Sequence, residues 1–420
     1  MRPLCPVLPG GGADDRRRRH GNAYGGALKE RYQLVVIGAG PAGSYAAWTA
    51  AKAGLDVLLV ERDVRAGLPL ACAEAISAGG LAAFVDPDPS FIATDIYTLS
   101  FTVATGAAFT YRSGERLGYV LDRPAFDRHL AERAVAVGVT LRTSTYASDV
   151  EMVDNGPAKI RLETIRGHSR VTADFVIAAD GVESMIGRMA GLNTVLPLSR
   201  SDTSLQYRVG GITLDPHCLE FCVGEKYSPD GYLWIFPKSD HAANVGLGFN
   251  PAANDSRELR VILDRFLKER YGKYTVEFEC CGMVPKFGGL DIVGRGNLLL
   301  AGDAARTVDS LTGAGIAKAL HTGRLAAETI VEAVQGRLAA SEAVDRYRTA
   351  IDAAVGKELR FMEKAHRIFR KFTDQDWESL AGFLEEYLSN QKAGSIDPAA
   401  IIKTALIRAP RLLRFARQLI

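Results

Sequence analysis

The residues in this sequence best suited to chemistry form a glycine-rich turn, Gly38-Ala39-Gly40-Pro41-Ala42-Gly43. Gly38 permits a tight turn, Gly40 lets the backbone approach a pyrophosphate, and Gly43 lets a helix pack closely against a strand. A helix that starts in this turn directs its N-terminus at the phosphate charge. Glu61, at the end of the next apolar run, can accept hydrogen bonds from a ribose but would repel a 2′-phosphate. The pattern therefore predicts a bound FAD or NAD.

Two further acidic residues follow apolar runs that are typical of buried strands. Asp180 follows Val176–Ala179, and Asp303 comes two residues after Leu298–Ala301. An NAD enzyme has no need of a second acid of this kind, whereas Asp303 can accept hydrogen bonds from the ribityl hydroxyls of a flavin. Gly313-Ala314-Gly315-Ile316 precedes a long helix whose N-terminus can stabilise negative charge on a reduced flavin ring. We therefore predict that the dinucleotide is FAD.

The elements that must position these residues begin with a βαβ unit. Leu34–Ile37 is a short apolar run of a buried parallel strand, and Val57–Val60 is a second one. Between them, the alanine-rich stretch Ala42–Ala53 favours a helix that Gly54 ends at its C′ position. Such a unit predicts a doubly wound α/β domain. Arg123 precedes a later helix, where it is well placed for the pyrophosphate or adenosine side of the cofactor.

The middle of the chain has a different pattern. Short alternating segments from Ser100 to about Tyr119, and strand-like pieces between about 197 and 284 with a helix near 255–271, predict a separate antiparallel sheet inserted into the nucleotide domain. From about residue 340 onward the pattern is helical only. The predicted parts are a disordered basic arm (1–30), a discontinuous FAD-binding domain (31–100, 117–196 and 285–335), a substrate domain (197–284 with about 100–116) and a C-terminal helical region (336–420).

Composition excludes several classes of protein. A net charge of +2 gives no sign of nucleic-acid binding. Six cysteines without C-x-x-C spacing and seven scattered histidines predict neither a disulfide scaffold nor a metal site, and fit a reducing cytosol. No run of 18 apolar residues predicts a membrane-spanning helix. We therefore expect a cytoplasmic protein, either free or in peripheral contact with the inner face of the membrane.

The last twenty residues, 401–420, carry five basic side chains and no acid. Their apolar residues recur at spacings near three and four, and Pro410 should divide the segment into two short helices or kink it. One interpretation is a basic amphipathic end that docks on an anionic bilayer. The other is a final helix packed on the domain with a solvated basic face.

With these motifs in order, the sequence resembles a known family over about residues 32–330. The succession of GxGxxG, D-R-x-x-F-D, A-D-G-x-x-S and G-D-A-A resembles the flavoproteins of the para-hydroxybenzoate hydroxylase fold. Within them, Cys72–Ser77, Asp86–Pro89 with the following Phe91-Ile92-Ala93, and Gly231–Lys238 resemble the geranylgeranyl reductases, including the digeranylgeranylglycerophospholipid reductases. The resemblance implies that reduced FAD saturates double bonds of an isoprenoid lipid. The predicted FAD contacts are Gly38, Gly40, Pro41, Ala42, Gly43, Glu61, Arg62, Arg123, Asp180, Gly302, Asp303, Gly313, Ala314, Gly315 and Ile316.

The remaining predicted site residues concern the substrate. Tyr232, Trp234 and Phe236 alternate, so on a strand they form an aromatic wall on one face, which is either plain core or, together with Pro237, the lining of a cavity for a polyprenyl chain. Such a wall would bind the chain by apolar burial and could stabilise a developing carbocation. Cys72 and Glu74 are the candidate catalytic residues, Cys72 as a general acid or as a small buried thiol.

The sequence also departs from the family pattern in three places. The family often has glycine where Ala75 and Arg306 stand, and commonly has proline in the loop that reads Val308-Asp309-Ser310-Leu311 here. These departures affect the expected loop conformation at the flavin, and with it the substrate, rather than FAD binding.

The expected reaction needs both a hydride and a proton, because an isolated alkene is a poor hydride acceptor. Flavin N5 would supply the hydride, and an acid or water near Cys72 the proton. The electron donor stays open among NADPH, ferredoxin and a reduced quinone, and a donor protein is one possible partner. One alternative is a flavin-dependent monooxygenase or halogenase, although Tyr232 and Phe236 depart from the halogenase motif W-x-W-x-I-P. The others are a prenyl-quinone side-chain reductase and a non-catalytic protein that binds FAD or a prenyl lipid.

Overall fold

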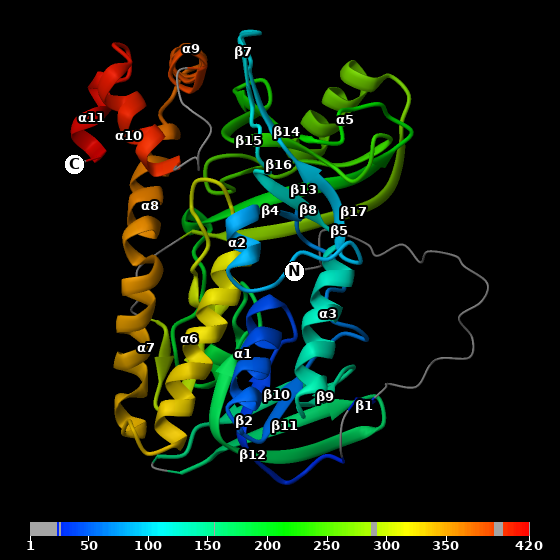
Figure 1. The fold of residues 1–420 in the computed structure, drawn as a ribbon, viewed down its shortest axis with the longest axis vertical. Coiled ribbons are helices and arrows are strands. Elements are labelled where there is room, and N and C mark those ends of the chain that lie inside the picture. The colour runs from blue at the N-terminus through cyan, green and yellow to red at the C-terminus, as the bar shows by residue number, and fades with distance from the viewer. Residues whose placement is uncertain (1–22, 25–26, 155, 287–291, 390–397, 420) are drawn as a thin grey trace.

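The computed structural model describes residues 23–24, 27–154, 156–286, 292–389 and 398–419. Its lower half in Figure 1 contains the predicted βαβ unit: β2 (Arg31–Ile37), α1 (Pro41–Lys52) and β3 (Val57–Val60). Gly54 follows α1 with φ +91°, the conformation expected of a residue that ends a helix. The prediction of this unit is therefore confirmed.

The first sheet surrounds this unit and is buried on both faces. The parallel strands β9, β3, β2, β12 and β19 lie side by side, and β1, β10, β11 and β18 add antiparallel pairs. Leu34 and Val36 face a core that α1, α3 and α6 cover, whereas Val35 and Ile37 face the opposite core. The bounds are β1 (Ala23–Tyr24), β9 (Thr140–Arg142), β10 (Tyr146–Glu151), β11 (Ala158–Thr164), β12 (Gly167–Ala178), β18 (Gly294–Arg295), β19 (Leu298–Leu300), α3 (Arg123–Ala136), α4 (Met185–Met189) and α6 (Ile316–Val334).

The second sheet occupies the upper half of the molecule (Figure 1) and confirms the predicted middle sheet. All its neighbouring strands are antiparallel except β14 and β6, which run parallel. The helix α5 (Glu258–Tyr271) covers one face through Leu259, Ile262 and Leu263. In spatial order the strands are β17 (Thr275–Pro285), β13 (Ser201–Gly210), β16 (Ala242–Phe249), β15 (Ser228–Pro237), β14 (Cys218–Gly224), β6 (Thr98–Val103) and β7 (Ala108–Arg112).

A small third sheet packs against the aromatic side of the second. Its strands are β4 (Ala75–Ser77), β8 (Gly118–Leu121) and β5 (Ile92–Ile96), and the short helix α2 (Ala78–Ala82) follows β4. Ile96 and Val120 of this sheet share an apolar cluster with Trp234 and Phe236 of β15. The loop with Cys72 and Glu74 leads directly into β4, so this packing holds that loop between the two larger sheets.

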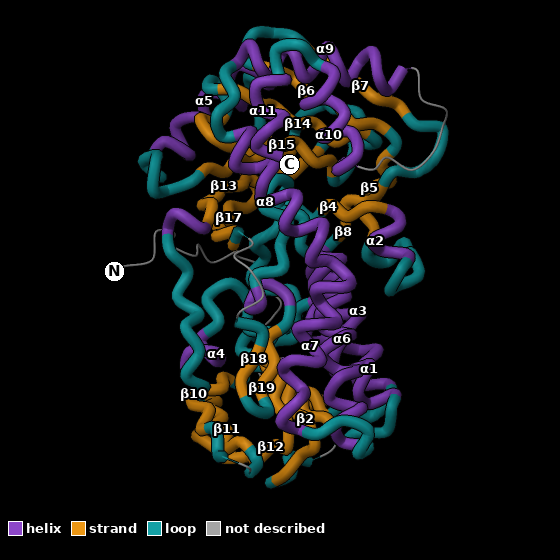
Figure 2. Tube along the Cα trace, turned by 90° about the vertical axis from the view of Figure 1, so that its left-hand side faces the viewer, coloured by secondary structure: helices purple, strands orange, loops and turns teal. Residues whose placement is uncertain are grey.

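The C-terminal region is helical over the residues that the structure describes, as predicted. Its elements are α7 (Ala343–Ile351), a π-helical turn (Asp352–Gly356), α8 (Lys357–Phe369), α9 (Asp374–Ser389), α10 (Pro398–Arg408) and α11 (Leu413–Leu419). Figure 2 shows α7 and α8 running along the molecule toward α9, α10 and α11 at the end that holds the second sheet. Pro410 separates α10 from α11, which confirms the predicted pair of short helices.

The apolar side of this C-terminal pair is buried inside the protein. Leu406, Leu412 and Phe415 pack in one cluster with residues of α8 and α9. Arg411 and Arg414 make ion pairs of 2.9 and 2.6 Å with Asp376, whose side chain is fully buried. The interpretation in which this apolar face meets a bilayer is therefore wrong for these residues, because the face already has a partner in α8 and α9. No helix within the described ranges is both long and apolar enough to cross a membrane.

The prediction of a disordered arm over residues 1–30 is wrong at the end of that segment. Residues 1–22 and 25–26 lie outside the described part of the chain. Ala23 and Tyr24, however, pair with Leu141 and Arg142 of β9, and Lys29 makes an ion pair of 2.8 Å with Asp56. The end of the predicted disordered segment is therefore part of the fold. The division of the chain into domains stays a prediction.

Candidate active site

The carboxyl ends of three parallel strands meet at one edge of the first sheet. β12 pairs in register with both β2 and β19, so that Ala178 lies beside Ile37 and Leu300. The residues that follow these strands are Gly38, Asp180 and Asp303, which the sequence predicts to bind FAD. Ligands of open α/β sheets bind at such an edge. The topology therefore brings together residues that are up to 265 positions apart in the sequence (Gly38 and Asp303).

The glycine turn has two closed positions and one open one. A Cβ atom on Gly38, which has φ +102°, would lie 2.3 Å from the carbonyl oxygen of Ala179, and one on Gly43 would lie 1.8 Å from that of Gly38. A Cβ atom on Gly40 would meet nothing within 4 Å. Gly40 also precedes α1 without a side-chain cap, and Pro41 begins the helix. Space beside free N–H groups at a helix N-terminus fits a pyrophosphate.

The acidic residues at this edge keep acceptor capacity for hydroxyl groups. Glu61 accepts hydrogen bonds from the backbone N–H groups of Ala39 (2.8 Å) and Asp63 (2.9 Å), which fix its carboxylate beside the turn. Asp180 accepts one from Ile186 through Oδ2, while its buried Oδ1 has no partner among the described residues. Burial raises the pKa of all three carboxyl groups, Asp303 included. An orphaned buried oxygen of this kind fits the hydroxyl groups of FAD.

The turn before α6 links this edge to the aromatic wall. Gly313 has φ +71°, and Gly315 precedes α6 without a side-chain cap, so the helix N-terminus keeps free N–H groups. The hydroxyl of Tyr232 on β15 donates a hydrogen bond of 2.5 Å to the carbonyl of Thr312. Tyr232, Trp234 and Phe236 lie on one face of β15, as predicted. The wall therefore starts at the point where the flavin ring is expected.

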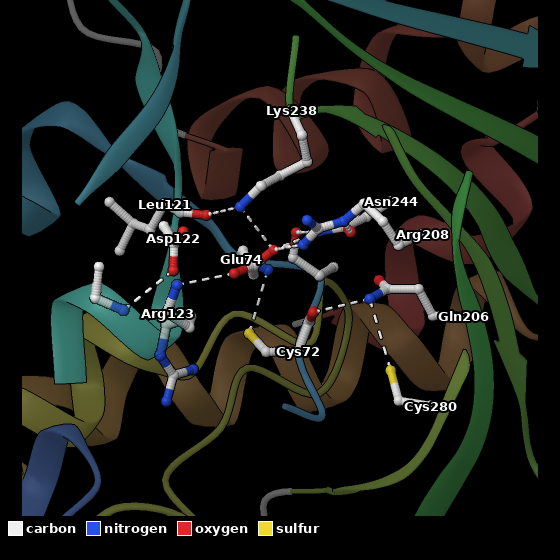
Figure 3. Close-up of polar contacts among 12 residues, drawn as sticks. Cys72, Glu74, Leu121, Asp122, Arg123, Gln206, Arg208, Lys238, Asn244 and Cys280 are labelled. Carbon is white, nitrogen blue, oxygen red and sulfur yellow. Dashed lines mark hydrogen bonds and ion pairs between the residues drawn. The ribbon is translucent and has the colours of Figure 1, made fainter. Parts of the chain in front are cut away.

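Glu74 is the centre of a buried ionic network (Figure 3). Its side chain is fully buried, and Oε2 lies 2.7 Å from Arg208 Nη2, 2.9 Å from Lys238 Nζ and 2.8 Å from Asn244 Nδ2. Its Oε1 accepts a hydrogen bond from the backbone N–H of Arg123. Glu74 also has φ +74°, a strained conformation for a residue with a side chain. With its oxygens occupied, Glu74 is placed to position the loop rather than to exchange protons with a substrate.

Cys72 and Arg123 lie side by side below this network (Figure 3). The Cys72 Sγ accepts a hydrogen bond of 3.2 Å from the N–H of Glu74, and Cys72 packs against the apolar cluster to which Ile316, at the start of α6, belongs. Burial raises the pKa of the thiol, although the Arg123 guanidinium opposes this effect. Arg123 itself forms a two-bond ion pair with Asp127 and also influences the pKa of Asp303. Arg123 thus lies near enough to Asp303 to affect it, and its place along the FAD stays a prediction.

Other predicted residues have simpler surroundings. Arg62 is exposed and lies 3.5 Å from Asp63, so the structure gives it no fixed place at the turn. Ala42 and Gly302 are in close contact, where α1 meets the segment after β19. Pro237 ends β15, and its carbonyl accepts a hydrogen bond from Thr94. No group of metal-ligating side chains occurs in the portion of the chain that the structure describes.

Sequence reasoning missed four residues of the site: Gln206, Arg208, Lys238 and Asn244. Gln206 accepts a hydrogen bond from Trp234 Nε1 (2.9 Å) and donates one to the carbonyl of Cys72 (3.0 Å), so it joins the aromatic wall to the Cys72 loop. The sequence pattern could have indicated two of them, because Gln206 and Arg208 alternate with apolar residues on β13. Polar side chains on a strand whose two faces are both covered need buried partners.

Comparisons with known proteins agree with this geometry. A sequence model described as "FAD dependent oxidoreductase" matches residues 33–235, and one described as "Geranylgeranyl reductase catalytic domain" matches residues 201–283. A digeranylgeranylglycerophospholipid reductase of Methanocella arvoryzae is 34% identical over 393 residues, which are 92% of this chain and 98% of the relative. The chain belongs to the geranylgeranyl reductase family.

Two further comparisons extend this assignment. Within the family, digeranylgeranylglycerophospholipid reductase 2 of Methanopyrus kandleri is also 34% identical, over 92% of this chain and 99% of its own. A crystal structure of a geranylgeranyl bacteriochlorophyll reductase-like protein from Thermoplasma acidophilum has a TM-score of 0.86 and 31% identity, and covers 93% of this chain and 100% of its own. A myxobacterial chondrochloren halogenase, at 18% identity and a TM-score of 0.66, shares the fold alone.

We predict that substitution of Gly40 and of Gly43 by alanine has different effects. Gly40→Ala should fold normally, since its Cβ meets no protein atom and its φ of −70° suits alanine. The added methyl group should lower FAD affinity about tenfold or more, because it fills space meant for the pyrophosphate. Gly43→Ala should instead destabilise the fold through its clash with Gly38. Thermal unfolding and flavin titration separate the two effects, and a Gly40→Ala variant with unchanged affinity would contradict this position for the pyrophosphate.

A second prediction concerns the ionic network. Glu74→Ala should lower the free energy of unfolding by about 3–5 kcal/mol, because Arg208 and Lys238 would remain buried without their carboxylate. The exposed pair of Glu151 and Lys159 provides the control, and Glu151→Ala should cost at most about 1 kcal/mol. Urea denaturation measures both. Equal effects of the two substitutions would show that the Glu74 network contributes no more than a surface ion pair.

Proposed function

We propose that this protein is an FAD-dependent reductase that saturates carbon–carbon double bonds of a geranylgeranyl chain on a membrane lipid or prenyl diphosphate. The observation that carries the proposal is the hydrogen bond from Tyr232 to Thr312. It fixes an apolar aromatic wall against the turn before α6, where a flavin ring belongs. When bound, reduced FAD supplies the hydride. The names of the relatives over nearly the whole chain support the same substrate class.

The protein's own residues contribute binding, orientation and the exclusion of water. Trp234 and Phe236 are more than nine-tenths buried beneath the small third sheet, so they form a rigid support. Tyr232 and Phe221 present the partly exposed surface of the wall. An isoprenoid chain on such a surface gains roughly 25 cal/mol per Å² of apolar area that it buries. The free N–H groups at the start of α6 stabilise negative charge on the reduced ring. Holding the alkene in one place beside the cofactor is the main catalytic contribution.

We further propose that Cys72 donates the proton that the second alkene carbon needs. Three observations support this role: Cys72 packs against the apolar cluster that contains Ile316 of the flavin turn, Glu74 N–H fixes its sulfur, and Gln206 fixes its carbonyl. Because burial raises its pKa, the group is a neutral thiol at physiological pH and holds a proton to give. The neighbouring Arg123 stabilises the thiolate that forms when the proton leaves.

The lipid substrate suggests work at a membrane surface, and we propose peripheral contact through the outer side of α10 and α11. Ile407 and Leu413 are exposed there, beside the exposed Lys403 and Arg408. Apolar and basic side chains together favour an anionic interface. This surface differs from the apolar face that packs against α8 and α9. We expect the inner face of the membrane, and electrons from NADPH, ferredoxin or a reduced quinone.

The reductase activity has a direct test. Protein reduced with dithionite under nitrogen should convert a geranylgeranyl lipid to products heavier by pairs of hydrogen atoms, while the FAD absorbance returns. Mass spectrometry identifies the product, and the rate of bleaching by each candidate donor identifies the donor. A well-folded, flavin-loaded protein that forms no saturated product would overturn the proposal. Oxygen consumption with NADH and an aromatic substrate would instead support the monooxygenase alternative.

The role of Cys72 predicts a particular pH dependence. A thiol whose pKa is raised stays protonated past its ordinary value of 9.0, so the rate should hold up to about that pH and then fall as the proton is lost. Cys72→Ser should abolish most of the activity without loss of FAD. Cys218→Ser, a buried cysteine on the other face of the second sheet, is the control and should keep the activity. An unchanged rate and pH profile for Cys72→Ser would assign the proton to another donor.

A further inference from the structure

A line of aromatic rings continues from the wall across the second sheet. In the strand register Trp234 is paired with Phe221, Phe221 with Phe101, and Phe101 with Phe109. The line therefore crosses β15, β14, β6 and β7 at right angles to the strands. We call Tyr232, Phe221, Phe101 and Phe109 the aromatic ladder, since these four rings form its continuous contacts.

Successive rings of the ladder touch one another. The ring centroids of Tyr232 and Phe221 are 5.7 Å apart, and those of Phe221 and Phe101 are 5.0 Å apart with the planes only 14° from parallel. Phe101 and Phe109 follow at 6.3 Å. The first ring is tied to the flavin turn through Thr312. The ladder thus connects the expected reaction centre to the far edge of the sheet.

The ladder is partly accessible in its middle and closed at its end. Tyr232, Phe221 and Phe101 are half-buried, whereas Phe109 is only 4% exposed. Ala381 and Leu388 of α9 pack over Phe109, and both views show α9 at this end of the second sheet (Figures 1 and 2). The small third sheet covers Trp234 and Phe236 on the other side. Phe221 and Phe101 lie at the margins of these two clusters and keep part of their surface accessible.

The chemistry of this strip suits a hydrocarbon. The polar atoms of Tyr232 and Trp234 are engaged by Thr312 and Gln206, so their ring carbons make up the wall. The same face of β14 adds Leu219 and Val223. Neighbouring strands lie about 4.8 Å apart, which is close to the length of an extended isoprene unit. Each step along the ladder therefore matches one unit of a polyprenyl chain.

The closed end also fixes the direction of the chain. A charged head group would lose its hydration against Leu388 and Phe109 without gaining a partner, and such a loss is costly. The apolar tail can end there without a penalty. The chain must therefore enter tail first, with the head group left on the flavin side.

We propose that Phe221 and Phe101 are specificity-determining residues that set how far the isoprenoid tail advances past the flavin turn. The inference rests on the proposed function. A double bond near the head group reaches the flavin turn before α6 only when the isoprene units on its tail side lie along the ladder. The depth of the ladder then decides which double bonds of a long chain are reduced.

Two substitutions test this proposal by blocking the ladder at different depths. Phe101→Trp should leave reduction of a geranyl substrate within about twofold of wild type, but slow reduction of the head-proximal double bond of a geranylgeranyl chain by about tenfold or more. Phe221→Trp, one strand nearer to Tyr232, should stop the reaction one double bond earlier. Products are identified by mass spectrometry with fragmentation along the chain, for the geranyl, farnesyl and geranylgeranyl diphosphates.

The controls separate this proposal from folding and from the proposed function. Phe101→Leu keeps an apolar side chain and should preserve full saturation, and Thr110→Trp adds the same ring to the outer face of the neighbouring strand β7, where Thr110 is exposed. Flavin content and circular dichroism confirm folding for each variant. Full saturation of the geranylgeranyl chain by both Phe101→Trp and Phe221→Trp would overturn the proposal. Equal losses of activity on the geranyl and geranylgeranyl substrates would also overturn it. A wild-type protein that reduces no isoprenoid would instead overturn the proposed function.

Discussion

The parallel pairing of β12 with both β2 and β19 is the constraint on which the site depends. Parallel strands present their carboxyl ends at one edge, and register alone decides which residues meet there. Because Ala178 lies beside both Ile37 and Leu300, the pairing of the three strands holds the glycine turn, Asp180 and Asp303 together at one edge. Asp180 keeps an unused acceptor atom there, since its buried Oδ1 has no hydrogen-bond partner among the described residues.

A second constraint joins this edge to the antiparallel sheet. Glu74 lies between them, with Arg208, Lys238 and Asn244 on the second sheet and Arg123 at the start of α3. Burying these charges is unfavourable unless each finds partners, so the network restricts the loop to one arrangement. The strained backbone of Glu74 is maintained by these contacts. Cys72 lies two residues earlier in the same loop, so the same network also fixes its position.

Local patterns were informative where one segment decides its own structure. The βαβ unit, the helix near 255–271, the break at Pro410 and the aromatic face of β15 were all predictable, because hydrophobic period and glycine or proline placement act within a few residues. Local patterns could not decide the structure where the partner comes from elsewhere in the chain. Residues 23–24, predicted to be disordered, join the first sheet because they pair with β9. The sequence left two interpretations of residues 401–420 open, and the packing of α10 and α11 against α8 and α9 decided where their apolar side lies.

The sequence by itself determined the cofactor and the family, since the glycine turn and the motifs that follow it are short, ordered and specific. It also determined that Tyr232, Trp234 and Phe236 share a face. Only the tertiary structure decided that this face meets the flavin turn through Thr312 and continues through Phe221 and Phe101, and that Glu74 is enclosed by cations. The reason is physical: these contacts join segments between 80 and 164 residues apart in the sequence, and strand order and register, which no local pattern encodes, bring them together.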